Sequence, residues 1–102
     1  MQVELLYWDG CPSHPEALSD LKRVLLELGI DTEVALREVT TDAQAAELGF
    51  VGSPTIRVDG DDLFDTGGAP PSLTCRVYRT RDGRFSATPD PEELRDVLAA
   101  RH

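Results

Sequence analysis

The arrangement of hydrophobic residues in the first part of this chain predicts a strand followed by a helix. Residues 2–8 (QVELLYW) are apolar on both faces, which is typical of a central strand covered on both sides. In residues 15–28, leucines recur at intervals of three and four and form one stripe of a helix. Gly29 follows and predicts the end of that helix.

The next part of the chain predicts a second strand and a short helix. Residues 32–39 alternate more regularly between apolar and polar side chains, which favours a position nearer the edge of a sheet. Thr41 and Gln44 have the spacing of a capping box, with which a helix begins. Gly49 supplies the C-terminal stop of this helix.

A hairpin and a further short strand follow. Residues 54–58 (PTIRV) predict a third strand. The Asp59-Gly60 pair favours a tight turn from this strand into residues 61–64. After a loop rich in glycine and proline, residues 75–79 (CRVYR) predict one more short strand.

The last helix begins after Asp90, which forms a capping box with Glu93, and its inner face consists of Leu94, Val97 and Leu98. The first strand–helix–strand unit is long enough for a right-handed crossover between parallel strands. We therefore predict an α/β fold with a central mixed sheet of four to five strands. It combines a parallel βαβ unit with an antiparallel hairpin, carries helices on both faces, and forms one domain over residues 1–102.

Charge and composition narrow the class of protein. The net charge is -9, from 19 acidic and 10 basic residues, and this predicts no nucleic-acid partner because phosphate binding needs a basic surface. No apolar run approaches the roughly 18 residues that a membrane-spanning helix needs. The N-terminus lacks the basic region and cleavage site of a signal peptide. We therefore expect a cytoplasmic protein without a membrane partner.

The chain has two cysteines, and the first lies where chemistry is expected. Cys11 follows the first predicted strand, whose carboxyl end is the usual position of an active site in such a sheet. His14 stands where a dithiol enzyme carries its second cysteine. A free thiol has a pKa of about 8.5, and either a helix N-terminus or a protonated His14 beside the sulfur would lower the pKa and increase the reactive thiolate.

Two starts are open for the helix after Cys11. If the helix begins at Cys11, Pro12 suits its first position, but Pro15 then falls where a backbone donor is needed. If Ser13 and Glu16 form the capping box, Cys11 lies just before the helix and experiences less of its dipole. The sequence does not choose between them.

A structural zinc site is not expected. Such sites usually take four protein ligands with characteristic spacing. The only cysteines and histidines are Cys11, His14, Cys75 and His102, and they do not form two half-sites with that spacing. We therefore predict no resident metal.

The stretches YWDGCPSH and GSPTIRVDGDDLFDTGG together resemble the thioredoxin-like superfamily. They are most similar to small bacterial thioredoxin- and glutaredoxin-like proteins, including an alkylmercury lyase-like group with a later CR.Y motif. The resemblance implies a thioredoxin-like fold and a redox site in which Cys11 is the attacking thiol and Pro54 is a cis-proline. It also implies a substrate-binding surface made of Trp8, Pro12, Ser53, Pro54, Thr55, Gly67 and Gly68.

The chain departs from this family's pattern in two ways. His14 replaces the second cysteine of the motif, so a disulfide within the motif is impossible. Residues 69–72 (APPS) replace the acidic residues that follow the paired glycines in glutaredoxins, which puts glutathione recognition in doubt. Cys75 could supply the missing thiol if residues 62–64 (DLF) form the return strand, because the following loop then comes back to the Cys11 end. If residues 75–79 instead pair with residues 54–58, Cys75 would start about 13 Å from Pro54, which is too far for a disulfide.

The leading hypothesis is a thiol–disulfide oxidoreductase in which Cys11, assisted by His14, forms mixed disulfides with a protein or a low-molecular-weight thiol. Cys75 or an external thiol would resolve them, and no cofactor is required. One alternative is a binding module in which Cys11 and Cys75 hold a soft metal, an organomercurial or a protein partner without turnover. Another is an interaction domain that retains the fold without chemistry.

Overall fold

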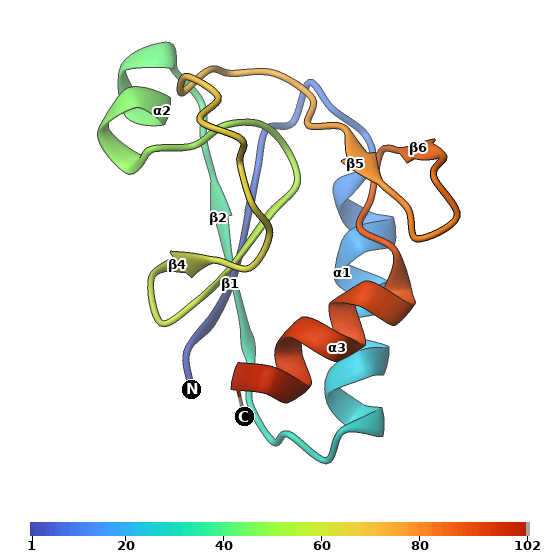
Figure 1. Cartoon of the computed structure of the whole chain (residues 1–102). Helices are drawn as coiled ribbons and strands as arrows, with labels where there is room; N and C mark the ends of the chain where they lie inside the picture. The colour runs from blue at the N-terminus through green and yellow to red at the C-terminus, as the bar shows by residue number, and fades with distance from the viewer. Residues whose placement is uncertain (102) are drawn as a thin grey trace.

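The computed structural model describes residues 1–101, so His102, one of the four candidate metal ligands, lies outside the described part (Figure 1). Its helices and strands are β1 (Val3–Tyr7), α1 (His14–Glu27), β2 (Val34–Glu38), α2 (Asp42–Leu48), β3 (Thr55–Val58), β4 (Asp61–Asp62), β5 (Tyr78–Arg79), β6 (Phe85–Ser86) and α3 (Pro91–Arg101). No helix in this part of the chain is long and apolar enough to cross a membrane.

Four strands form one mixed sheet with the order β2-β1-β3-β4. β1 runs parallel to β2 and antiparallel to β3, and β3 is antiparallel to β4. The predicted α/β class and mixed sheet are therefore confirmed. β2 occupies one edge, as its alternating pattern indicated.

Apolar side chains fill both faces of the sheet, because consecutive residues of β1 point to opposite sides. Leu5 packs on the face covered by α1 and α3, whereas Leu6 packs on the face covered by α2. Figure 1 shows α1 and α3 beside each other, with α2 on the other side of the sheet. The first layer includes Leu21, Leu25, Ile56, Leu94 and Leu98, and the second includes Val39, Ala45 and Phe50.

The predicted helix start and hairpin turn are present. The Thr41 hydroxyl accepts a hydrogen bond from the Gln44 backbone N–H at 3.1 Å and begins α2. Asp59 and Gly60 have φ angles of 52° and 86°, which are the left-handed conformations of a tight hairpin turn. β3 therefore returns as β4, and the chain runs back toward the end of the sheet at which Cys11 lies.

Residues 75–79 are not a fifth strand of the central sheet. Only Cys75 forms an isolated bridge to that region, opposite Ser53, and β5 instead pairs with β6 in a separate hairpin. The reason is the path of the preceding loop, which carries the chain past Ser53 rather than along the free edge of β4. The sequence analysis did not predict β6.

Candidate functional site

Cys11 lies in the turn between β1 and α1, and its side chain is buried. Its backbone N–H donates to the carbonyl of Trp8 at 3.0 Å and closes the turn. The Trp8 ring lies so close to Gly10 that a Cβ there would come within 2.6 Å of Cε2 of the indole, so a larger residue does not fit. Cys11 is only 3% exposed, although the resemblance implied that it is the attacking thiol.

A disulfide joins Cys11 to Cys75, which is 64 residues later in the chain. Their Cα atoms are 5.6 Å apart. The backbone of Ser53 fixes the position of Cys75 from the other side: its N–H donates to the Thr74 carbonyl at 2.8 Å, and its carbonyl accepts from Arg76 at 2.9 Å. In contrast to Cys11, Cys75 is an exposed residue. The layout in which the chain returns directly after the Asp59-Gly60 turn is thus the correct one, although the return strand is Asp61–Asp62 rather than residues 62–64.

The Ser53–Pro54 peptide bond is cis, as the resemblance implied. The Tyr78 hydroxyl donates to the Pro54 carbonyl, and the Thr55 hydroxyl donates to the Gly52 carbonyl at 2.6 Å. The Cys11 sulfur lies 3.7 Å from the carbonyl oxygen of Ser53. The backbone on the Ser53 side of Pro54 is therefore already paired with the protein's own segment around Cys75.

A buried arginine beside Cys75 holds this segment in place. Arg76 is 8% exposed, and its guanidinium donates to Asp62 at 2.7 Å, to the Thr55 hydroxyl at 3.3 Å and to the Phe64 carbonyl at 3.2 Å. It also lies 4.7 Å from the centre of the Tyr78 ring. These contacts tie the residues after Cys75 to β3 and β4 independently of the disulfide.

Burial is the main cause of the raised pKa of the Tyr78 hydroxyl, and the nearby Arg76 charge opposes it only in part. The phenol therefore stays protonated and donates its hydrogen bond at neutral pH. The CR.Y motif contains Arg76 and Tyr78, but the sequence alone indicated no role for them or for Asp62. The available signal was alternation, because Arg76 and Tyr78 share one face of an extended segment.

The His14 side chain is half-buried at the start of α1. Its ring stacks on Tyr7, with centroids 4.1 Å apart, and its Nδ1 atom is buried without a hydrogen-bond partner. The helix begins at His14 with Ser13 as N-cap, so Cys11 lies before the helix as in the second of the two open starts, but the predicted Ser13–Glu16 capping box does not form. The Ser13 hydroxyl makes no capping bond and lies 3.4 Å from the Cys11 sulfur instead.

The remaining predicted residues surround the site unevenly. Ser53 and Thr55 are fully buried, Trp8 is half-buried, and Pro12 is exposed. The paired glycines at 67 and 68 lie in an exposed loop, where a Cβ would meet no atom within 4 Å.

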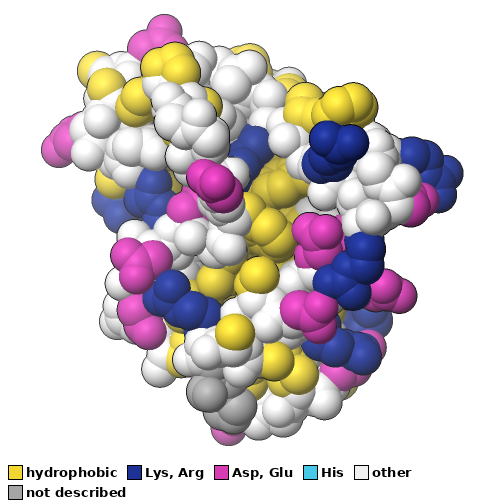
Figure 2. All heavy atoms as spheres, in the orientation of Figure 1, with side chains coloured by type: hydrophobic (Ala, Val, Ile, Leu, Met, Phe, Trp, Pro, Cys, Tyr) yellow, Lys and Arg dark blue, Asp and Glu magenta, His cyan; other side chains and the backbone are white. Residues whose placement is uncertain are grey.

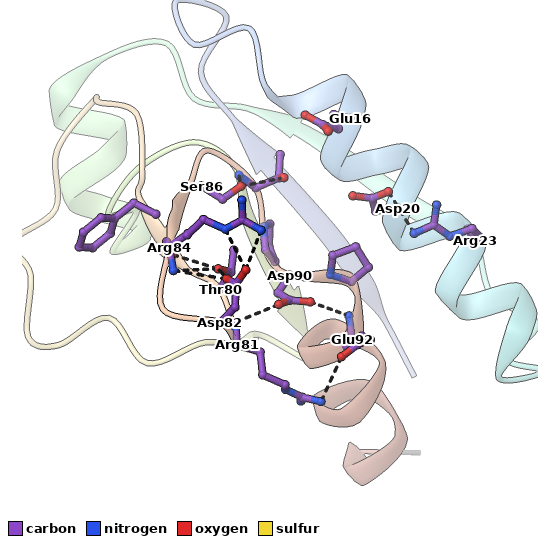
Figure 3. Close-up of a pocket in the computed structure, with 14 residues that line it drawn as sticks. Glu16, Asp20, Arg23, Thr80, Arg81, Asp82, Arg84, Ser86, Asp90 and Glu92 are labelled. Carbon is purple, nitrogen blue, oxygen red and sulfur yellow. Dashed lines mark hydrogen bonds and ion pairs between the residues drawn. The ribbon is translucent and has the colours of Figure 1, made fainter.

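An open hollow of about 930 Å³ lies between α1, the β5–β6 hairpin and the start of α3, away from the sulfur atoms (Figure 3). Several of its charged groups pair with one another: Arg84 with Asp82 at 2.7 Å, and Arg81 with Glu92 at 3.6 Å. Cys11, His14 and Cys75 do not line this hollow.

Metal ligands are few around the disulfide. Among residues 1–101, no group of three or more His, Cys, Asp and Glu side chains could hold a metal ion. Reduction would leave Cys11 and Cys75 as two neighbouring thiols, which are ligands that soft metals prefer.

Comparison with protein-family models, curated proteins and solved structures finds no match to this chain. The functional argument therefore depends on the geometry of the site.

Proposed function

We propose that this protein is a thioredoxin-fold thiol–disulfide oxidoreductase whose redox pair is Cys11 and Cys75. One observation carries the proposal: a disulfide joins a buried half-cystine at the end of the central strand to an exposed half-cystine beside the Pro54 loop. A disulfide reachable from one side is suited to exchange, because an incoming thiolate must approach a sulfur atom directly.

The arrangement of elements supports the thioredoxin-like part of the proposal. A parallel β1–α1–β2 unit is followed by α2, an antiparallel β3–β4 hairpin and a final helix on the α1 side. Cys11 lies after the carboxyl end of β1, where open α/β sheets usually carry their chemistry. The redox pair differs from a CxxC motif because its second sulfur comes from a distant segment.

Exposure assigns the first attack to Cys75 rather than to Cys11. A partner thiolate attacks the Cys75 sulfur, the bond between the two cysteines breaks, and Cys11 leaves as a thiolate. A second partner thiolate attacks the partner's own sulfur in this mixed disulfide and releases Cys75 as a thiolate. Two partner thiols become one disulfide, and their two electrons reduce the protein.

The reverse reaction uses the same atoms. The Cys75 thiolate attacks a substrate disulfide and releases one substrate thiolate, and Cys11 then resolves the mixed disulfide. The substrate is a protein or a low-molecular-weight thiol or disulfide. No cofactor is needed because electrons pass only between sulfur atoms.

A redox titration tests this proposal. The protein is equilibrated in dithiothreitol buffers of known potential, its free thiols are alkylated, and the two forms are separated by mass. We expect a midpoint between about -270 and -180 mV, the range of thioredoxins, glutaredoxins and disulfide isomerases. A midpoint below about -300 mV would identify a structural disulfide and contradict the proposal.

Cysteine variants identify the attacked sulfur. In Cys11→Ser, an activated disulfide reagent should form a stable mixed disulfide with Cys75, because the variant has no second thiol to displace the reagent. In Cys75→Ser, the buried Cys11 should react more slowly with the same reagent. Equal trapping rates would remove the basis for assigning the attack to Cys75. If the reduced wild type binds Hg(II) but exchanges with no disulfide, the metal-binding alternative is correct.

A further inference from the structure

The residues that follow Cys75 alternate between solvent and the protein interior. Arg76 and Tyr78 are buried, whereas Cys75, Val77 and Arg79 are exposed. In an extended chain, consecutive side chains point to opposite sides, so the exposed residues of this segment share one face. The exposed half-cystine is therefore the first residue of an outward-facing row.

The β5–β6 hairpin widens this row with a second strand. Phe85 lies directly opposite Arg79, and cross-strand partners project from the same face. Val77 is 66% exposed and Phe85 is 76% exposed, which are unusual values for large apolar side chains. We call Cys75, Val77, Arg79 and Phe85 the outward stripe. Figure 2 shows hydrophobic and basic side chains next to each other in this region of the surface.

Arg79 differs from the other arginines of this segment. Arg76 is buried against Asp62, Arg81 pairs with Asp96 at 2.5 Å, and Arg84 pairs with Asp82. Figure 3 shows the last two arginines directed toward acidic side chains. Arg79 forms no ion pair within residues 1–101. Its charge is therefore available to a partner beside the apolar part of the outward stripe.

We propose that the outward stripe is the docking surface for the protein thiol that exchanges with the disulfide. The partner segment that fits it carries apolar and acidic side chains next to its cysteine. Val77 and Phe85 would bury the apolar groups, and Arg79 would pair with a carboxylate. The inference rests on the proposed function, because it places the partner's cysteine against Cys75.

Charge complementarity favours an acidic partner at this position. The chain has a net charge of -9, so an acidic partner is repelled by most of the surface. Arg79 lies four residues beyond Cys75 along the extended segment, on the same exposed face, and its unpaired cation would offset that repulsion on this side of the molecule. Arg79 would thus act on the association rate and on the choice of partner rather than on the disulfide itself.

The experiment measures reduction of the disulfide by two pairs of synthetic peptides. In the first pair, each peptide has one cysteine next to leucine, flanked by two glutamates in one peptide and by two lysines in the other. The second pair has glycine in place of leucine. For each protein, the rate with a peptide is divided by the rate with dithiothreitol. This ratio is then compared between variant and wild type for the same peptide, so that the intrinsic reactivity of the peptide thiol cancels. The variants are Arg79→Glu and Val77→Ser/Phe85→Ser.

Arg79→Glu should lower the ratio of acidic-peptide to basic-peptide rates by about fivefold at low ionic strength, and the effect should shrink in 0.5 M salt. Val77→Ser/Phe85→Ser should slow both leucine peptides by about threefold or more relative to peptides with glycine in place of leucine. Lys22→Glu is the matched control, since Lys22 is an exposed cation on α1 without an ion pair among the described residues.

Two failures can be told apart. If dithiothreitol reduces the disulfide at a potential typical of oxidoreductases but Arg79→Glu changes the peptide ratio no more than Lys22→Glu does, the docking surface is wrong and the proposed function stands. The same conclusion follows if Val77→Ser/Phe85→Ser changes the rates of the leucine and glycine peptides equally. If the disulfide is reduced only at the lower potentials typical of structural disulfides, the proposed function itself fails.

Discussion

At Gly52 the backbone passes so close to Arg76 that no side chain fits. A Cβ at this position would lie 2.8 Å from Cβ and 2.9 Å from the backbone nitrogen of Arg76, and the φ of 141° is itself unfavourable for other residues. Gly52→Ala should therefore push residues 75–76 away from the Pro54 loop. We expect a loss of about 2–4 kcal/mol in the free energy of unfolding, measured by urea denaturation.

Gly60→Ala separates backbone strain from the steric clash. Gly60 also has a positive φ, of 86°, but a Cβ there would meet no atom within 4 Å. It should cost only about 1 kcal/mol and leave the Cys11–Cys75 disulfide intact. Equal losses in the two variants would show that contact with Arg76 is not what Gly52 provides.

Tyr78 makes stability depend on pH in the alkaline range. Burial raises the pKa of its hydroxyl above the ordinary value of 10.0, so the folded protein holds this proton more tightly than the unfolded chain does. The resulting stabilisation is complete below pH 10 and is lost as the pH rises through the folded pKa, by up to about 1.4 kcal/mol per pH unit.

Tyr78→Phe tests this prediction because it removes only the hydroxyl. The variant should lose about 1 kcal/mol at pH 7, since the Pro54 carbonyl no longer receives its hydrogen bond. Above pH 10, its free energy of unfolding should fall less steeply than that of the wild type in denaturant titrations. Parallel slopes for the two proteins would show that Tyr78 does not titrate differently on folding.

Among the elements, the position of the β5 segment depends on a buried ion pair. The side chains of Arg76 and Asp62 are 8% and 17% exposed, so removal of either leaves an uncompensated charge in a desolvated place. Arg76→Met should cost about 3 kcal/mol in the reduced protein. The double variant with Asp62→Leu should cost clearly less than the sum of the single variants.

A surface ion pair in the same hairpin region provides the control. Arg84 and Asp82 are mostly exposed, so removal of their pairing should change the stability little.

Arg76→Met should also make the disulfide easier to reduce, because Cys75 would be held less firmly against Cys11. Additive costs for Arg76 and Asp62, with an unchanged redox midpoint, would show that the pair does not position Cys75.

For the whole molecule, the disulfide closes a loop of 64 residues around most of the sheet. Chain-entropy arguments give such a crosslink about 4 kcal/mol of stabilisation, through restriction of the unfolded state. Cys75→Ala should therefore lower the free energy of unfolding by up to that amount without a cavity in the core, since Cys75 is exposed. Dithiothreitol should lower the stability of the wild type by a similar amount and leave that of Cys75→Ala unchanged.

Most of the secondary structure was predictable because it depends on local periodicity. The central strand β1, the leucine stripe of α1, the cap at Thr41 and the turn at Asp59-Gly60 are all encoded within a few residues. The β5–β6 hairpin was not predictable in this way. Its two-residue strands are too short to establish a period.

The sequence by itself determined the α/β class, the mixed sheet and the location of Cys11 at the end of β1, because each of these follows from which faces of a segment must avoid water. Only the tertiary structure decided that Cys75 reaches Cys11, that Cys11 is the buried partner, and that His14 stacks on Tyr7. These relations join residues far apart in the chain or depend on side-chain packing. The approach of Cys75 to Cys11 is set by the path of a long loop and by close contact at Gly52, for which local pattern carries no signal.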